Sequence, residues 1–493
     1  MFRTTTLLPA LAALLAAPAA AEVYVVHPTP GVGDFTSVAE ALAHPALADG
    51  DTVWVHAGTY TGALVCEEAI FLEALDGPAA TVLAVGGVHV TSAERVTLFD
   101  CVIEDNHPTG DAGIPAGGVL VDLGAKALLY GLDVRGNTSL SIGGVLTGPF
   151  AEVDVVNCRV RGNGGSGTIT GGMLLGGSGR LVNVQVTGNV GTGIGGVYVA
   201  GGAGPAVVEI GSCTIYGNWG SSPAGSVGGV FLDDGGDVTI VNTIVYENHG
   251  TPGGDVMASG DFFPGPAPGS LDLSYSHVGT PGTGIPMGAG MIPLGLPPLF
   301  VAPASAFPAG PTIAGDFGLL PGSPDVDAGL SAAFPLDASA GDLGGVLREL
   351  GAAIDMGAYE LGASCPAPIY FGDGKPSSIG SVPYLTAEGE PSIAAGSFAL
   401  SVHDAVPGAV AILFSGPARA YGPFGGGTLY VKGSLGRLGL SVLDGTGGGT
   451  FPLAPGPSLA GSTRYYQLWL SDPAHSDGTG VGLSDAVEVT WCD

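Results

Sequence analysis

The residues best suited to chemistry are charged side chains on three consecutive repeats of the chain. An arginine set among carboxylates could bind an acidic sugar or supply a base. We favour a plainer interpretation, a row of ion pairs on an exposed sheet, because opposite charges on neighbouring strands attract each other. No set of three acids accompanies the arginines to hold Ca²⁺. The cluster consists of Glu104, Asp133, Arg135, Arg159 and Arg161.

Two further groups of acids are candidate sites. Asp233 and Asp234 form a carboxylate pair, but adjacent strand residues point to opposite faces, so a turn is the preferred interpretation. A second group could bind Ca²⁺ through its carboxylate oxygens. Because that stretch has no loop of defined ligand spacing, we favour a buried carboxylate–arginine network and predict no metal site. This second group is Asp327, Asp337, Asp342, Arg348, Asp355 and Glu360.

A repeat ending in asparagine defines the elements that must position these residues. The asparagines lie 31, 26, 26, 29 and 30 residues apart, and a Gly-Gly pair recurs at the same pace. Repeats of this length indicate stacked supersecondary units. The six asparagines are Asn106, Asn137, Asn163, Asn189, Asn218 and Asn248.

The positions before each asparagine predict the shape of one repeat. Residues ten, eight, five and three before it are mostly apolar, as at Val153, Val155, Cys158 and Val160. This spacing predicts two strands joined by a one-residue corner, and a third strand follows each Gly pair. Three short strands per coil predict an all-β chain built as a right-handed parallel β-helix, with the asparagines stacked as an amide ladder. The expected corner residues tolerate left-handed backbone: Asp100, Gly131, Asn157, Asn183, Ser212 and Asn242.

The third strand of each coil predicts an apolar outward column with no carboxylate pair and no base. Such a column would be a docking surface and not a catalytic one. The alternative is that loops of varying length fold over the column and bury it. The column is His89, Leu120, Leu146, Leu174, Tyr198 and Phe231.

The two ends of the chain differ from the repeats. A basic start, an apolar stretch and an Ala-x-Ala site predict a signal peptide at residues 1–21, with cleavage near Ala21. We therefore expect a secreted or cell-surface-associated protein without a membrane span. The predicted β-helix covers 22–362, with a capping helix near 36–44 opened by a capping box at Ser37, and an irregular closing segment at 263–362. A small β-sandwich-like domain is expected at 365–493.

Charge and cysteines restrict the partners and the covalent links. The formal net charge of −31 opposes binding of nucleic acid and of anionic membranes. Cys101, Cys158 and Cys213 share an inward column but lie two coils apart, too far for disulfides, and Cys66 has no evident partner. We expect these four to be free thiols. Cys365 and Cys492 bracket the last domain and are the predicted disulfide pair.

Several motifs carry a resemblance to a known family. They include Gly33-Asp-Phe-Thr-Ser-Val38 and Ala57-Gly-Thr-Tyr60 near the start, and Asp355-Met-Gly-Ala-Tyr-Glu360 near the end of the predicted helix. With the repeats, they resemble the secreted bacterial right-handed parallel β-helix family, whose superfamily contains pectate lyases and pectin methylesterases. Residues 365–493 resemble a C-terminal β domain of secreted planctomycete-type proteins, with Lys375 at a usual cysteine position.

The resemblance implies where an active site would lie. Enzymes of this superfamily use Asp pairs for hydrolysis, or Ca²⁺-binding acids with an Arg or Lys base for lyase chemistry. The chain lacks both complete sets. We therefore expect a non-catalytic binding or structural protein whose ligand is a carbohydrate or another surface protein. The alternative is a polysaccharide lyase or glycoside hydrolase that uses Arg135, Arg159 and Arg161.

Overall fold

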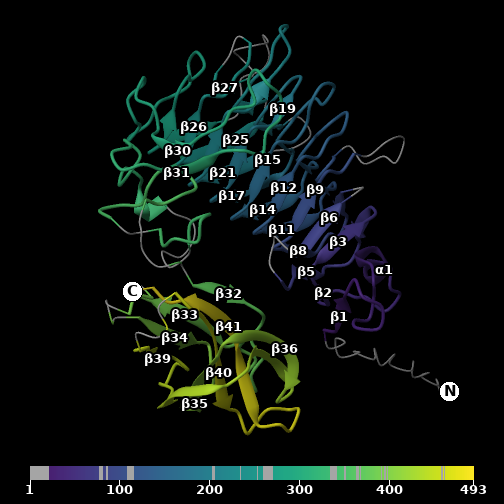
Figure 1. Ribbon diagram of the computed structural model, residues 1–493, viewed down its shortest axis with the longest axis vertical. Coiled ribbons are helices and arrows are strands. Elements are labelled where there is room, and N and C mark those ends of the chain that lie inside the picture. Colours follow the sequence, from purple (N-terminus) through teal and green to yellow (C-terminus); the bar gives the residue numbers. More distant parts are fainter. Residues whose placement is uncertain are drawn as a thin grey trace, which may run out of the picture.

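The computed structural model describes most of the chain as a β-helix followed by a second β domain (Figure 1). The described residues are 21–76, 81–84, 87–107, 116–201, 206–233, 235–251, 254–258, 270–333, 341–348, 351–361, 366, 368–389, 391–393, 396, 398–456, 459 and 461–492. The predicted signal peptide, apart from Ala21, lies outside them, as do Asp234, Asp337 and Cys365.

The predicted parallel β-helix is confirmed. Three parallel sheets, named sheets A, B and C below, run along the stack and contain ten, nine and eight strands. Sheet A consists of β1 (Val23–Val26), β2 (Thr52–Val55), β5 (Phe71–Ala74), β8 (Arg95–Phe99), β11 (Lys126–Tyr130), β14 (Glu152–Val156), β17 (Ser178–Val182), β21 (Ala206–Gly211), β25 (Gly236–Val241) and β28 (Leu271–Ser274).

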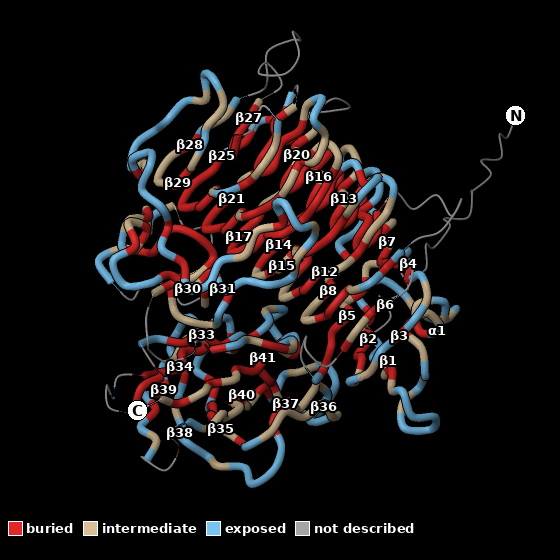
Figure 2. Tube along the Cα trace, turned by 45° about the horizontal axis from the view of Figure 1, so that its top comes forward, coloured by how far each residue is buried: buried red, intermediate tan, exposed pale blue. Residues whose placement is uncertain are grey.

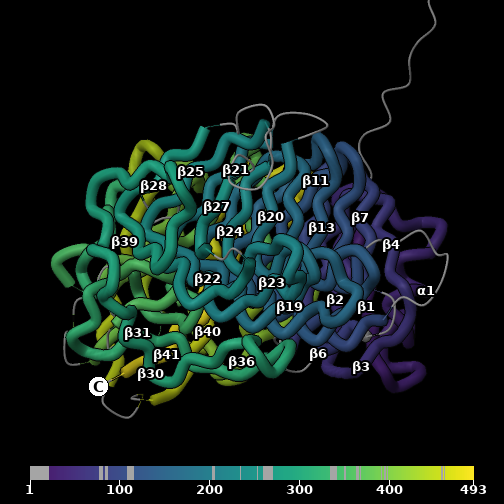
Figure 3. Tube along the Cα trace, turned by 90° about the horizontal axis from the view of Figure 1, so that it is seen from above, coloured from purple at the N-terminus to yellow at the C-terminus, as the bar shows by residue number. Residues whose placement is uncertain are grey.

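Sheets B and C complete each coil, and Figure 3 shows the coils following one another from purple to teal. Sheet B consists of β3 (Gly58–Thr61), β6 (Thr81–Ala84), β9 (Val102–Glu104), β12 (Asp133–Arg135), β15 (Arg159–Arg161), β18 (Gln185–Thr187), β22 (Thr214–Tyr216), β26 (Ile244–Tyr246) and β29 (His277–Val278). Sheet C consists of β4 (Leu64–Cys66), β7 (Val88–Val90), β10 (Val119–Val121), β13 (Val145–Thr147), β16 (Met173–Leu175), β20 (Val197–Val199), β24 (Val230–Leu232) and β27 (Val256–Ala258).

The corners and the inward column follow the predicted spacing. The four inward residues of one coil are at most 4% exposed: Val153, Val155, Cys158 and Val160. Figure 2 shows that buried residues, in red, run through the whole stack of coils. Each predicted corner residue has a left-handed backbone, with φ between 52° and 67°. The sharp bend between sheets A and B therefore depends on residue types that tolerate this conformation.

The predicted asparagine ladder is confirmed on all six coils. Each amide nitrogen donates to the side-chain oxygen of the next asparagine, over 2.8–3.0 Å. The last amide, Asn248, donates instead to Asp255 Oδ1, over 2.8 Å. Asp255 comes from the loop before β27 and thus ends the ladder with a carboxylate.

Cys66, Cys101, Cys158 and Cys213 are buried free thiols, as predicted. Burial raises the pKa of Cys66, Cys158 and Cys213 to about 12, so they behave as small apolar residues. The predicted partner of Cys492, Cys365, lies outside the described residues. That disulfide stays a prediction.

A short helix covers the first coils. Helix α1 (Val38–Leu42) lies within the predicted range 36–44 and buries Val38 and Ala41 against the core. The predicted capping box is wrong, because the Ser37 side chain makes no capping hydrogen bond. A helix of five residues is stabilised mainly by packing against the β-helix core, so a capping hydrogen bond would add little to its stability.

The segment after the last coil folds back along sheet B. Strands β28 and β29 still belong to sheets A and B, so regular coils continue into the range predicted to be irregular. Beyond them, the antiparallel pair β30–β31 (Phe300–Ala302, Asp316–Leu319) and a 3₁₀ turn at Ser331–Ala333 flank the stack. The small parallel pair β19–β23 (Val190–Gly191, Trp219–Gly220) lies within the coils, directly after Asn189 and Asn218. We call residues 304–313 the strap, because they run antiparallel to the stack over successive turns.

The named strands that the structure describes in the second domain pair antiparallel, an isolated parallel bridge joins Ser392 and Cys492, and the domain contains its own core. Its five-stranded sheet follows the order β32-β41-β40-β35-β38, beside a three-stranded sheet β33-β34-β39 and a hairpin β36–β37. The bounds are β32 (Ile369–Phe371), β33 (Tyr384–Glu388), β34 (Ala399–His403), β35 (Val410–Gly416), β36 (Ala418–Phe424), β37 (Gly427–Lys432), β38 (Gly436–Val442), β39 (Gly449–Pro452), β40 (Thr463–Ser471) and β41 (Val481–Thr490).

Candidate functional site

The arginine cluster lies on the outward face of sheet B in the predicted register. Arg135 pairs with Glu104 on one side and Arg161 on the other, and Asp133 is the register partner of Arg159. Arg161 binds both carboxylate oxygens of Asp133 over 2.9 and 2.6 Å. Arg135 bridges Asp133 and Glu104 over 3.0 and 2.6 Å. The described cluster is therefore a continuous ion-pair row.

The closing segment covers this cluster. Arg159 Nη2 donates to the Leu343 carbonyl over 2.8 Å, and Arg161 Nη1 donates to the Ile313 carbonyl over 2.9 Å. The Asp133 side chain is only 11% exposed. Both arginines therefore hold the returning chain in place. Their guanidinium groups are occupied by protein acceptors and do not face an open groove.

The acids of the closing segment bind backbone N–H groups. Asp342 accepts from the amides of Gly344, Val346 and Glu360, each over 2.7 Å. Arg348 is fully buried, donates to the Gly357 carbonyl over 2.9 Å and lies 3.9 Å from Glu360. Burial raises the pKa of Asp342 and lowers that of Arg348. Within the described residues, no group of three or more His, Cys, Asp or Glu side chains is placed to hold a metal ion.

The other acids of this segment have similar structural roles. Asp355 accepts from the amides of Asp327 and Leu361, and Asp327 accepts from the amide of Ala352. Asp233 closes a turn to Gly236, in agreement with the predicted turn, while its neighbour Asp234 lies outside the described residues.

The predicted apolar column forms one continuous row on sheet C. His89, Leu120, Leu146, Leu174, Tyr198 and Phe231 are successive register partners on six coils. Met257 extends the row by one coil, and the sequence pattern did not assign it. We call these seven residues the sheet C strip.

The sheet C strip is only half covered by its neighbours. Leu120, Phe231 and Met257 are at most 9% exposed, whereas the other members keep intermediate exposure. The covering side chains come from the turns before the Gly pairs, namely Ala116, Ile142, Ile194 and Val227. Both interpretations of this column are therefore partly realised: three of its members are buried, and the other four keep intermediate exposure.

Polar groups border the strip at two places, beside its first residue His89 and its fifth residue Tyr198. His89 Nε2 lies 3.1 Å from Asp122 Oδ2. The Tyr198 hydroxyl donates to Asp233 over 2.5 Å. The pKa of Asp122 lies below its ordinary value, mainly because its carboxylate accepts a hydrogen bond from the Leu123 amide. The neighbouring His89 lowers this pKa further. An apolar row with hydrogen-bonding groups at its margins matches the composition of ligand-binding surfaces.

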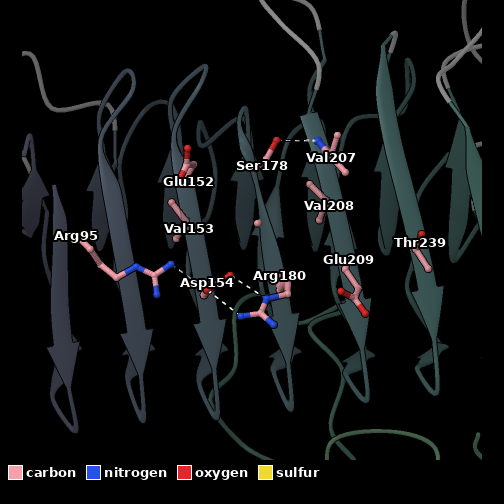
Figure 4. A pocket seen from close by; sticks show the side chains of 11 residues that line it. Arg95, Glu152, Val153, Asp154, Ser178, Arg180, Val207, Val208, Glu209 and Thr239 are labelled. Carbon is pink, nitrogen blue, oxygen red and sulfur yellow. Dashed lines mark hydrogen bonds and ion pairs between the residues drawn. The ribbon is translucent and has the colours of Figure 1, made fainter. Parts of the chain in front are cut away.

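A polar depression on sheet A was not predicted (Figure 4). It has a volume of about 510 Å³ and lies above Ser178 and Gly179. Arg95 and Arg180 bind Asp154 from opposite sides over 3.2 and 3.0 Å. Burial alone would raise the pKa of Asp154, but the bonds and charges of Arg180 and Arg95 hold it below its ordinary value.

A signal for this depression was present in the sequence. Asp154 and Arg180 stand nine residues before a ladder asparagine, at an outward position of the first strand of the coil. The side chains of Arg95 and Arg180 remain 51% and 42% exposed. The arrangement is an open ion-pair row that could bind polar ligands.

Comparisons with known proteins do not assign a family. No family model matches the chain, and no curated protein matches it. Among solved structures, a pectin methylesterase from Aspergillus niger matches at 13% identity, covering 56% of this chain and 84% of that one, with a TM-score of 0.28. A likeness this low carries no weight. The fold rests on the hydrogen-bonded registers themselves.

Proposed function

We propose that this is a secreted, non-catalytic protein that binds an extended polysaccharide along the sheet C strip. The supporting observation is the strip itself, a straight and partly open row of apolar and aromatic side chains on neighbouring coils. Strands of one sheet are spaced about 4.8 Å apart, so the strip presents a regular linear surface. Aromatic and aliphatic side chains bind the apolar faces of sugar rings, while marginal polar groups bind hydroxyls.

The arginine cluster does not support the alternative of a lyase or hydrolase. A catalytic base must lie within hydrogen-bond reach of its substrate proton. Arg159 and Arg161 instead bond to closing-segment carbonyls, and Arg161 also binds Asp133. The expected secretion rests on the N-terminal sequence at 1–21.

Binding to a panel of polysaccharides tests this proposal. The mature protein should retain one class of polymer in affinity electrophoresis, without forming reducing ends or unsaturated products. Combining Tyr198→Ala with Leu174→Ser should weaken binding at least about tenfold, or about 1.4 kcal/mol. Val207→Ser is the control, because Val207 is an exposed apolar residue (54%) on sheet A, in the polar depression and outside the sheet C strip.

Two results would contradict the proposal. Reproducible cleavage of a polysaccharide by the wild type would establish an enzyme. Binding that survives the sheet C double variant but fails in Val207→Ser would place the ligand in the sheet A depression. A ligand found to be another surface protein would keep the binding role and correct the ligand class.

A further inference from the structure

The charges of the β-helix are distributed unevenly among its three sheets. Residues 22–364 contain 34 acids and only seven lysines and arginines. The basic residues are Arg95, Lys126 and Arg180 on sheet A, the three arginines of the cluster on sheet B, and the buried Arg348 of the closing segment. Each base on sheets A and B already bonds to an acid or to a backbone carbonyl.

Sheet C differs from the other two sheets because it has no basic side chain of this kind. In the sequence, neither the sheet C strands nor the segments that join them to sheets A and B contain a lysine or an arginine. The sheet C strip therefore lies on the one sheet whose acids are not offset by lysine or arginine. A ligand that approaches the strip enters a field of negative sign.

Acids follow the strands of sheet C and border the strip. Asp122 comes directly after β10, and its side chain is 51% exposed and lies 3.1 Å from His89. Asp233 comes directly after β24 and accepts a hydrogen bond from Tyr198. The equivalent turns after β4 and β7 contain three further exposed acids: Glu67, Glu68 and Glu94. This margin of the strip is therefore acidic on several coils.

The strip and its acidic margin form a long surface. Val65 of β4 is the register partner of His89 and is 38% exposed, so the apolar row begins one coil earlier. Figure 2 shows the sheet C strands β7, β13, β16 and β20 along the side of the stack away from the second domain. Asp122 and Asp233 follow equivalent strand positions four strand spacings apart, about 19 Å. A ligand that contacts both acids must therefore be an extended chain.

The sign of these charges distinguishes between classes of polysaccharide. Polymers of uronic acids or sulfated sugars would bring anions against acids that no lysine or arginine offsets. A neutral polymer could bond its hydroxyl groups to the carboxylates but would gain nothing from the field. A polymer with an amino group on each ring keeps the apolar ring faces and adds ammonium groups, which bind carboxylates through charge-assisted hydrogen bonds. Charge complementarity therefore favours a polymer of amino sugars.

We propose that the ligand of the sheet C strip is a polysaccharide with free amino groups, whose ring faces lie on the strip and whose ammonium groups bind Asp122 and Asp233. This inference rests on the proposed polysaccharide-binding function and names the class of polymer. His89 and Tyr198 hold the two carboxylates beside the strip. A carboxylate has about four acceptor positions, so these bonds leave it able to accept an ammonium donor as well.

Isothermal titration calorimetry with two oligosaccharides of equal length tests the proposal. The hexamer of glucosamine carries free amines, and its fully N-acetylated counterpart has the same backbone without charge. In a slightly acidic buffer of low salt, the mature protein should bind the amine hexamer at least about tenfold more tightly than the acetylated one. This preference should shrink as salt is added, because ions screen exposed charges.

Variants of the two acids locate the preference. Asp122→Asn combined with Asp233→Asn should abolish most of it and leave binding of the acetylated hexamer nearly unchanged, which also shows that the variant is folded. The matched control combines Asp272→Asn with Asp316→Asn, since these exposed acids lie on β28 of sheet A and on β31. The control removes the same charge and should keep the preference.

The possible failures of this inference and of the proposed function are distinguishable. Equal or tighter binding of the acetylated hexamer by the wild type would overturn the inference and leave the proposed function in place. A preference that survives in the Asp122/Asp233 double variant would overturn the inference as well, as would binding of another polysaccharide but of neither hexamer. If no polysaccharide binds, whether or not a lysine hexapeptide does, both the inference and the proposed function fail.

Discussion

At the scale of single residues, the asparagine ladder is complete in its hydrogen bonds. Asn163 Nδ2 donates to Asn189 Oδ1 and to the Val134 carbonyl, and its Oδ1 accepts from both nitrogens of Asn137. All of the amide's donors and acceptors are thus used inside a dry core. At the end of the ladder, Asp255 takes two donors from Asn248 and two from Thr280.

Removing one central asparagine side chain should show how much the ladder contributes to the stability of the protein. Asn163→Ala should destabilise the protein by about 1–3 kcal/mol, because it leaves buried partners on both neighbouring coils without bonds. Asn106→Ala should cost less, since its contact with the Leu83 carbonyl is long at 3.4 Å and no asparagine precedes it. Denaturant melts measure both. Equal, negligible losses at the two sites would contradict the ladder's contribution.

At one corner residue, by contrast, a substitution should stabilise the protein. Ser212 has a φ of 52°, and its buried hydroxyl has no hydrogen-bond partner among the described residues. Ser212→Gly should therefore stabilise the protein by about 0.5–1 kcal/mol, because glycine adopts this backbone without strain and carries no hydroxyl. Asn183→Gly is the contrast. Asn183 shares this backbone but bonds to Asn157 and Gly341, so the change should destabilise. A lower melting temperature for Ser212→Gly would refute the argument.

At the scale of elements, the turns between sheets B and C determine where the strap can lie. The residue before the ladder asparagine is glycine with positive φ at Gly162, Gly188 and Gly217. A Cβ on any of these would collide with strap backbone or side chains. The strap bonds to the same turns, through Thr312 to Gly188 and Ala306 to Gly217. Glycine is thus needed there for close approach as well as for backbone conformation.

A pair of glycine variants separates these two requirements. Gly188→Ala should cost well above 1 kcal/mol and increase proteolysis within 304–313, because its Cβ meets the Thr312 carbonyl. Gly124→Ala is the matched control, with φ of 69° against 63° and no atom within 4 Å of its Cβ. Gly124→Ala should destabilise the protein by only about 1 kcal/mol, because only the left-handed backbone conformation disfavours alanine at this position. Equal losses, with the strap still protected in hydrogen exchange, would contradict the close-approach argument.

At the scale of the whole molecule, the second domain contacts the first coils through an aromatic cluster that encloses charges. Trp54 of β2 packs edge-on against Tyr421, with centroids 4.4 Å apart. Tyr421 also donates to Glu73 over 3.4 Å. On the other side, Arg419 binds Glu488 over 2.9 Å and lies 4.1 Å from the centre of the Phe371 ring. The described contact therefore places more acids than bases in a nearly dry space.

This contact should weaken as pH rises. Burial raises the pKa of Glu73 to about 7, against an opposing effect of Arg419 and a further increase from Asp100 and Asp373. Burial raises the pKa of Asp100 to about 7 as well. Because these folded-state values lie above the unfolded ones, the stability that the neutral acids contribute is complete below about pH 4 and is lost as pH rises towards 7.

The variant Glu73→Gln measures this contribution. The glutamine side chain stays neutral and can still accept a hydrogen bond from Tyr421. The melting temperature of the variant should therefore fall less than that of the wild type between about pH 5 and about pH 8, the range in which Glu73 loses its proton. Exposed Glu94→Gln is the control and should leave the pH profile unchanged. Parallel profiles for the wild type and Glu73→Gln would show that Glu73 is ionised without cost.

The sequence by itself determined the features that every coil must repeat. The ladder asparagines, the corner residues, the inward apolar column and six of the seven residues of the sheet C strip were predictable, because neighbouring coils impose the same local spacing on each repeat. The free thiols of Cys101, Cys158 and Cys213 followed from the same spacing. This spacing is set within a single coil, and it recurs on six coils of the sequence.

Only the tertiary structure decided what becomes of the charged residues. Arg159 bonds to a carbonyl 184 residues later, and Arg161 to one 152 residues later, so no local pattern reveals that the cluster is covered. The same holds for Arg95 reaching Asp154 across a strand and for Glu73 beneath the second domain. Repeat spacing specifies the coils, whereas returning segments and docked domains are specified by contacts that occur once.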